Sequence, residues 1–138
     1  RGGASRSEVV VSDREINFPE VTSPDMLLAM TQDSYDKFSK SVKKGGVILS
    51  DSTFVKACPV DGVRCFEYGI TNLAKDELGE IRAANIVALG ILTGLNGFIS
   101  EQAMLDAVLG RLPAKVHELN VKAFEAGYAE GLKMLGGR

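Results

Sequence analysis

The stretch from Met26 to Ser52 constrains the fold of this chain most, because two apolar runs flank a helical pattern. The first run is Met26 to Met30, and the second begins at Val47 as VILSDS. Between them, TQDSYDKFSKSVKKGG has an apolar stripe and a glycine stop: Tyr35, Phe38 and Val42, then Gly45 and Gly46. A strand, a helix and a strand in this order form a βαβ unit with parallel strands and a right-handed crossover. The pattern therefore predicts an α/β fold.

Polar residues follow both predicted strands of this unit. Thr31 and Gln32 come after the first strand, and Asp51 and Ser52 lie at the end of the second. In open parallel sheets, ligands bind beyond the carboxyl ends of the strands, so these residues are candidates for ligand contacts. An alternative stays open for Thr31 and Ser52, since Thr and Ser at such positions also serve as helix caps or turn residues.

Two further segments are expected to contribute strands. Residues 7–12 include three consecutive valines, which predict a buried strand. Residues 54–67 contain Asp61-Gly62 between two semi-apolar stretches, which predicts a hairpin turn. Its better strand is 63–68, because Pro59 restricts the other strand to a short or edge position.

The second half of the chain is expected to be helical. Residues 82–95 predict a buried helix in which the amide of Asn85 is either tied to a neighbouring backbone or aimed at a ligand. Ser100 is expected to be the N-cap of a short helix through Leu109, and Pro113 is expected to open a long last helix. The long helix has two glycines on its apolar face, Gly127 and Gly131. Because glycine lowers helix propensity, this pair predicts close packing against another helix, the sheet or a partner subunit.

Composition excludes several classes of function. The chain has 16 Lys and Arg against 18 Asp and Glu, and a net charge of -2 attracts neither nucleic acid nor an anionic membrane. No apolar run is long enough to cross a bilayer, so the protein is expected to be soluble and cytoplasmic.

Cys58 and Cys65 lack the spacing of zinc or iron–sulfur ligands and predict reduced thiols, and His117 is expected on a helix surface. No metal site is therefore expected.

Five stretches together resemble the gamma subunit, or gamma domain, of the 2-oxoacid:ferredoxin (acceptor) oxidoreductases: RGGASRSEVVVSD, PDMLLAMTQDSYDKF, KKGGVILSDS, ANIVALGILTG and PAKVHELNVKAFEAGYAEG. They cover almost the whole chain in the family's order. In that family the RGG stretch is internal and follows a strand and a glycine-rich turn, so the chain resembles a gamma subunit without its N-terminal βα unit. The resemblance implies one Rossmann-like, three-layer domain over residues 1–138, with a mainly parallel sheet and helices on both faces.

The resemblance also implies a function. The family oxidatively decarboxylates a 2-oxoacid on thiamin diphosphate, passes electrons through iron–sulfur clusters to ferredoxin, and releases an acyl-CoA. This chain has no Gly-Asp-Gly thiamin motif and no cysteine set for a cluster. Thiamin diphosphate, magnesium and clusters are therefore expected on partner alpha, beta and ferredoxin-like delta subunits, with coenzyme A as co-substrate. The favoured substrate is 2-oxoglutarate, and pyruvate or branched-chain 2-oxoacids are alternatives.

The N-terminal loop is the candidate for the substrate and coenzyme A side of the active site. Its members are Arg1, Gly2, Gly3, Ser5 and Arg6. Arginine forks suit a carboxylate or phosphate, and glycines let backbone N–H groups approach the same anion. The alternative is that this loop only turns into its strand.

Two other functions stay open. One is a stand-alone α/β module that binds a nucleotide or acyl group without catalysis, since a βαβ unit with polar strand ends occurs in many unrelated proteins. The other is a homodimer, in which a second copy pairs with the first strand or the Gly127 and Gly131 face. A subunit is expected to expose a large apolar surface when isolated, whereas a monomeric module is expected to have one concave pocket.

Overall fold

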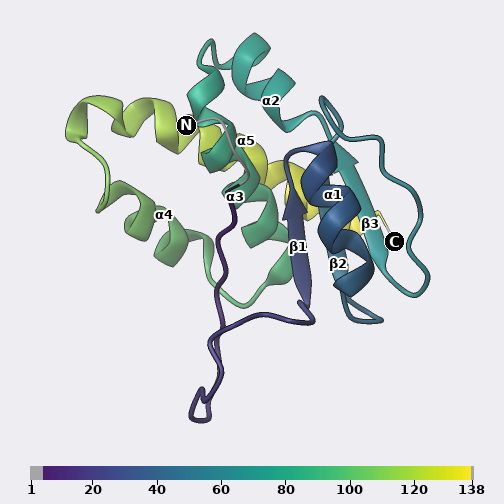
Figure 1. Ribbon diagram of the computed structural model, residues 1–138. Coiled ribbons are helices and arrows are strands. Elements are labelled where there is room, and N and C mark those ends of the chain that lie inside the picture. Colours follow the sequence, from purple (N-terminus) through teal and green to yellow (C-terminus); the bar gives the residue numbers. More distant parts are fainter. Residues whose placement is uncertain (1–4, 138) are drawn as a thin grey trace. The chain divides into compact units, whose positions relative to one another are not determined.

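The computed structural model describes residues 5–137, whose helices and strands are labelled in Figure 1. Contacts between residues divide the chain into two compact units. The first unit contains the residues up to 50 and residues 54–67, and the second contains residues 51–53 and those from 68 onward. The single domain expected from the sequence stays a prediction.

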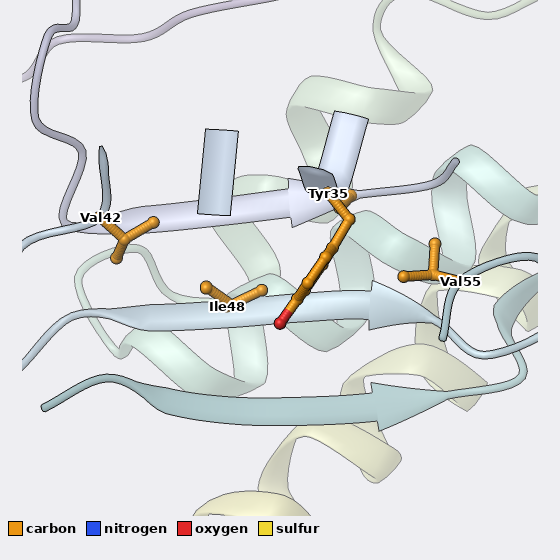
Figure 2. Close-up of a cluster of buried hydrophobic side chains, with 5 residues drawn as sticks. Tyr35, Val42, Ile48 and Val55 are labelled. Atoms are coloured by element: carbon orange, nitrogen blue, oxygen red, sulfur yellow. The ribbon is translucent and has the colours of Figure 1, made fainter. Parts of the chain in front are cut away.

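Three parallel strands form the sheet, in the order β1-β2-β3 (Figure 2). Their bounds are Met26–Ala29 for β1, Val47–Asp51 for β2 and Arg64–Tyr68 for β3. The β1–β2 register pairs Met26 with Val47 and Ala29 with Ser50. Helix α1, Gln32–Phe38, joins these two strands. The predicted βαβ unit and the α/β class are therefore confirmed.

Helix α1 is shorter than its sequence pattern predicts. A 3-10 turn, Ser39–Ser41, follows it, and Val42 has extended backbone with φ -65 and ψ 134. The N–H of Lys43 donates to the Pro24 carbonyl at 3.0 Å. The helix thus ends early because Val42 is already extended and the Lys43 backbone is bonded to Pro24, which directs the chain into β2.

The core of the first unit lies between α1 and the sheet. Figure 2 shows the side chains of Tyr35, Val42, Ile48 and Val55 gathered beside β2. Together with Ala29 they form one buried cluster, and all five are at most 7% exposed. The apolar stripe predicted for the helical stretch therefore does face the core through Tyr35 and Val42.

The strand predicted at residues 7–12 is wrong. These residues form no strand, and Val9 and Val11 are 80% and 86% exposed. A strand needs a neighbour that bonds its backbone, and residues 5–137 provide none for this segment. Instead, the Val21 N–H donates to the Glu8 carboxylate at 3.5 Å, so the segment folds back on its own polar side chains.

The predicted hairpin around Asp61-Gly62 is also wrong, although these two residues do form a turn with Gly62 at φ +71. β3 pairs with β2 and not with residues 54–62: the Arg64 N–H donates to the Gly46 carbonyl at 3.0 Å. The backbone of Lys56 is bonded to a side chain of α1 instead of a strand. Residues 52–63 are therefore a crossover loop between two parallel strands.

The second unit is helical, as the sequence predicts. After β3 come α2, Ile70–Asn72, which continues as a π-helical turn, Leu73–Glu77, then a 3-10 turn, Ile81–Ala83, and α3, Ala84–Asn96. They are followed by α4, Glu101–Leu109, a 3-10 turn, Ala114–Val116, and α5, His117–Gly136. The Ser100 hydroxyl caps α4 by accepting the Ala103 N–H at 3.2 Å. Pro113 stands directly before the turn that opens into α5.

Helices α3 and α5 pack backbone against backbone. A Cβ placed on Gly127 would lie 2.1 Å from the Val87 carbonyl oxygen, and one on Gly90 would lie 2.3 Å from that of Phe124. Gly131 likewise faces Gly94, with 3.1 Å between the added Cβ and the Gly94 Cα. The close packing predicted for the glycine pair of α5 is therefore confirmed, and its partner is α3.

The environment of Asn85 differs from the expectation. Its neighbours in α3 are buried, but Asn85 itself is exposed. Its side-chain oxygen accepts the Ile86 N–H at 2.9 Å, so of the two alternatives the structure shows the bond to a neighbouring backbone. His117 is partly exposed, as expected. Among the described residues, no helix combines the length and apolar character that a bilayer span requires.

Candidate functional site

The carboxyl end of β2 is fixed by a buried acid, Asp51. Its side chain is 0% exposed. One carboxylate oxygen accepts the Thr53 N–H at 3.0 Å. The other accepts the Thr71 N–H at 3.1 Å and also the Thr71 hydroxyl. Since both oxygens are engaged, Asp51 holds the local backbone and does not present an oxygen to a ligand. We call Asp51, Thr53 and Thr71 the Asp51 clamp.

The clamp ties the turn after β2 to the start of α2 after β3. The Thr53 hydroxyl accepts the Asn72 N–H at 3.3 Å. The Ser52 N–H donates to the Tyr68 carbonyl at 2.9 Å, which extends the pairing of the two strands. The Ser52 side chain itself is exposed. A rigid polar turn therefore presents this hydroxyl at the carboxyl ends of β2 and β3, where α/β sheets bind ligands.

The residues after β1 have local structural contacts. Thr31 is the N-cap of α1, and its hydroxyl accepts the Ser34 N–H at 3.3 Å. The Gln32 side-chain oxygen accepts the Lys56 N–H at 2.8 Å, and its amide donates to Asp36 at 2.9 Å. Of the two alternatives for Thr31, the structure shows the cap. Gln32 fastens the loop that precedes β3 to the first turn of α1.

Part of the predicted N-terminal loop lies outside the described residues: Arg1, Gly2 and Gly3. Ser5 is exposed. The Arg6 guanidinium lies 2.8 Å from the Glu8 carboxylate, 3.7 Å from that of Glu20 and 5.4 Å from the ring centre of Phe38. Its side chain stays 46% exposed. An incoming anion would therefore compete with two carboxylates for this cation.

Tyr68 is a further candidate residue at the strand ends that the sequence analysis did not name. It is the last residue of β3 and is partly buried. Burial raises the pKa of its phenol, and the negative charges of Glu130 and Glu77 raise it further. The hydroxyl therefore remains a neutral hydrogen-bond donor at physiological pH. The signal was available, because the rule that picked out the ends of the first two strands applies equally to the end of 63–68.

The polar residues at the carboxyl ends of β2 and β3 are suited to binding and positioning a ligand. Within residues 5–137, no three His, Cys, Asp or Glu side chains gather as a metal site. Every buried side-chain nitrogen or oxygen in this part of the chain has a hydrogen-bond partner, so no orphaned group points to a missing cofactor. The described residues therefore do not fit a resident metal cluster, and the acid at the strand end is occupied by the clamp.

Comparison with known proteins points to one group of enzymes. The sequence model of the pyruvate ferredoxin/flavodoxin oxidoreductase family matches residues 1–130. The 2-oxoglutarate synthase subunit KorC of Methanocaldococcus jannaschii is 42% identical over 130 residues, which are 93% of this chain and 70% of that protein.

Two solved structures have the same fold. The gamma subunit of a keto/oxoacid ferredoxin oxidoreductase from Geobacter sulfurreducens is 43% identical, with a TM-score of 0.75 over 79% of this chain and 64% of that one. The 2-oxoglutarate:ferredoxin oxidoreductase from Magnetococcus marinus, solved with 2-oxoglutarate, coenzyme A and succinyl-CoA bound, is 26% identical. Its TM-score is 0.72, over 88% of this chain and 22% of that one. These likenesses agree with the Rossmann-like α/β fold expected from the sequence.

Proposed function

Because this chain belongs to the pyruvate ferredoxin/flavodoxin oxidoreductase family, we propose that it is the gamma-type part of a multi-subunit 2-oxoacid:ferredoxin oxidoreductase. The favoured substrate is 2-oxoglutarate, and the observation that carries this choice is the 42% identity to a 2-oxoglutarate synthase subunit over 93% of the chain. The chain spans 64% of the solved gamma subunit's length, so the activity of the whole enzyme is part of the proposal.

The role proposed for the chain is to support catalysis. Its own residues bind and position, while thiamin diphosphate, magnesium and iron–sulfur clusters belong to alpha, beta and ferredoxin-like delta partners. Residues 1–138 act as one gamma-type domain in the cytoplasm, ferredoxin accepts the electrons, and coenzyme A is the co-substrate. A homodimer of the isolated chain, the alternative state, would have to use a surface other than the Gly127 and Gly131 face, because α3 already covers that face.

Exposed apolar side chains favour a subunit over a stand-alone binding module. Phe98 is 91% exposed, Phe18 is 67% exposed, and Val9 and Val11 are both at least 80% exposed. Exposed apolar side chains that gather in one patch mark interaction sites in soluble proteins, whereas single ones are ordinary. These surfaces are what a chain buried among partners requires.

The N-terminal loop of Arg1, Gly2, Gly3, Ser5 and Arg6 is proposed to face coenzyme A or the 2-oxoacid. We expect Arg1→Ala in the assembled enzyme to raise the KM for one of these two anions while kcat changes little. Arg6→Ala is the matched variant, because Arg6 already pairs with Glu8 and Glu20. Unchanged KM values for both anions in the Arg1 variant would refute the binding role and leave the loop as a connection into the following segment.

The strand-end candidates divide into two roles in this proposal. Ser52 and Tyr68 of the second unit face the ligand, and Asp51 of the same unit holds the backbone beside them. Thr31 and Gln32 of the first unit hold the start of α1. Asn85, exposed on α3, is a further candidate for contact with a partner or ligand.

The test of the proposed function is a native purification of the tagged chain from its host grown without oxygen. The eluate is assayed for reduction of a viologen dye that depends on both coenzyme A and a 2-oxoacid. We expect brown, iron–sulfur-containing partners and the highest rate with 2-oxoglutarate, compared with pyruvate and 2-oxoisovalerate. A chain that elutes alone and reduces no dye would refute the subunit function, and a preference for another 2-oxoacid would refute the substrate.

A further inference from the structure

Both cysteines of the chain line one small pocket. Its volume is 340 Å³, and its walls come from the crossover loop and β3: Ala57, Cys58, Pro59, Val63, Cys65 and Glu67. Both thiols are free and exposed. The two cysteines thus line the same open pocket, a juxtaposition that the sequence spacing, which predicts only reduced thiols, does not reveal.

The backbone of each cysteine is held in place. The Tyr35 hydroxyl donates to the Cys58 carbonyl and accepts the Cys58 N–H at 3.2 Å. Cys65 lies within β3, and its thiol is 3.8 Å from the Val63 carbonyl oxygen. Burial raises the pKa of Tyr35, and the negative charge of the nearby Cys65 adds to this shift. The Tyr35 hydroxyl thus fixes the Cys58 side of the pocket to α1.

We propose that Cys58 and Cys65 form a dithiol site that reacts with low-molecular-weight disulfides and closes to an internal disulfide. The loop that would be closed is short and already turns back at Asp61-Gly62, so closure costs little chain entropy. A metal ion is the less suitable occupant, because no third His, Cys, Asp or Glu completes a ligand set within the described residues. The inference goes beyond the proposed function and does not depend on it.

The reaction is a pair of thiol–disulfide exchanges. One cysteine thiolate attacks a sulfur of the small disulfide RSSR, which forms a protein–SR mixed disulfide and releases RS⁻. The second thiolate attacks the protein sulfur of that mixed disulfide, which forms the Cys58–Cys65 bond and releases a second RS⁻. The two protons lost by the cysteines are taken up by the two released thiolates. Overall, two protein thiols are oxidised and RSSR is reduced to two RSH.

Closure would stiffen the loop before β3. The same loop contains Lys56, whose backbone N–H is bonded to Gln32 at the start of α1. A covalent link between this loop and β3 would therefore hold the hydrogen bond between Lys56 and Gln32, one of the strand-end candidates, in place. The state of the two cysteines, reduced or joined, would thus depend on the thiol–disulfide balance of the surroundings. It would set how rigidly this loop is held beside β3.

The test treats the full chain, purified without oxygen, with oxidised glutathione. Arg64 stands between the two cysteines, so trypsin places them on separate peptides, residues 57–64 and 65–75. We expect these two peptides to be joined by a disulfide, with two glutathione molecules released per chain. Two separate glutathione adducts on one chain, or a link between two chains, would overturn the proposal.

Three variants sharpen the test. Cys58→Ser and Cys65→Ser each leave one thiol, so we expect a single stable glutathione adduct in place of the linked peptides. Tyr35→Phe keeps the ring but removes the hydroxyl that holds Cys58, and we expect the equilibrium constant for closure to fall about fivefold. An unchanged constant in Tyr35→Phe would overturn the role of this hydroxyl as the anchor. Because both cysteines are exposed, their serine variants should fold normally.

Discussion

Gly127→Ala is expected to destabilise the chain strongly, because the added methyl group has no space in the α3–α5 contact. Its Cβ would lie 2.1 Å from the Val87 carbonyl oxygen, 2.9 Å from the Val87 carbonyl carbon and 3.1 Å from the Ile91 nitrogen. All three are backbone atoms, so no flexible side chain can move aside. The helices would have to separate by about 1 Å to restore an ordinary contact.

The magnitude results from two opposing effects. Overpacking a well-filled interior costs about 1–3 kcal/mol, and the upper end applies where only backbone can yield. Replacing a helical glycine with alanine returns about 1 kcal/mol of helix propensity. The free energy of unfolding should therefore fall by about 2 kcal/mol. For a chain of this size, that corresponds to a decrease in Tm of about 8 °C.

Gly136→Ala in the same helix is the matched control. Nothing lies within 4 Å of a Cβ placed there, so only the propensity effect acts. We expect this variant to be as stable as the parent or up to about 1 kcal/mol more stable. Unfolding in urea, followed by circular dichroism, gives both values. The reasoning fails if Gly127→Ala is no less stable than Gly136→Ala.

Three further predictions concern the clamp, a strand end and a helix cap. Asp51→Ala should lower the free energy of unfolding by about 2–4 kcal/mol, because three donors, two of them buried, lose their acceptor. Exposed Asp61→Ala should change it by less than about 0.5 kcal/mol in the same urea titration. Burial raises the pKa of the Tyr68 phenol above 10.0, so the unfolded chain loses the phenol proton at a lower pH than the folded chain does. The free energy of unfolding therefore falls as the pH rises through 10. Urea denaturation midpoints measured across this pH range should fall less steeply in Tyr68→Phe. Ser100→Ala should cost about 1 kcal/mol, measured by the same unfolding assay, and a variant as stable as the parent would contradict the capping role.

The elements that could be predicted from the sequence are those whose cause is local. The stripe of Tyr35 and Val42 and the Ser100 cap are both set by residues within a turn or two of one another. The glycine pair of α5 predicted a close contact for the same reason. Its partner required a second pattern that was overlooked, the Gly90 and Gly94 pair with the same spacing in α3. The glycine stop at Gly45 and Gly46 was not needed, because α1 already ends at Phe38.

The two wrong strands show where local signals fail. Val9 and Val11 have high β propensity, but that propensity measures how well a side chain fits a neighbouring strand, and these valines have no such neighbour among the described residues. Asp61-Gly62 does turn the chain, as its type predicts. The pairing of β3 after this turn is decided by Tyr35 and Gln32, which bond the loop from α1 and leave β3 free to pair with β2.

The role of Asp51 depends on a residue 20 positions away. Position alone places an acid at the end of a strand, where it can face either a ligand or the protein. The choice is made by Thr71, because its buried N–H and hydroxyl need an acceptor and a buried donor left without one is costly. Once Asp51 turns inward, the next residue points outward. We therefore propose Ser52 as the ligand-facing residue at this strand end, because its exposed hydroxyl stands on the turn that the clamp holds.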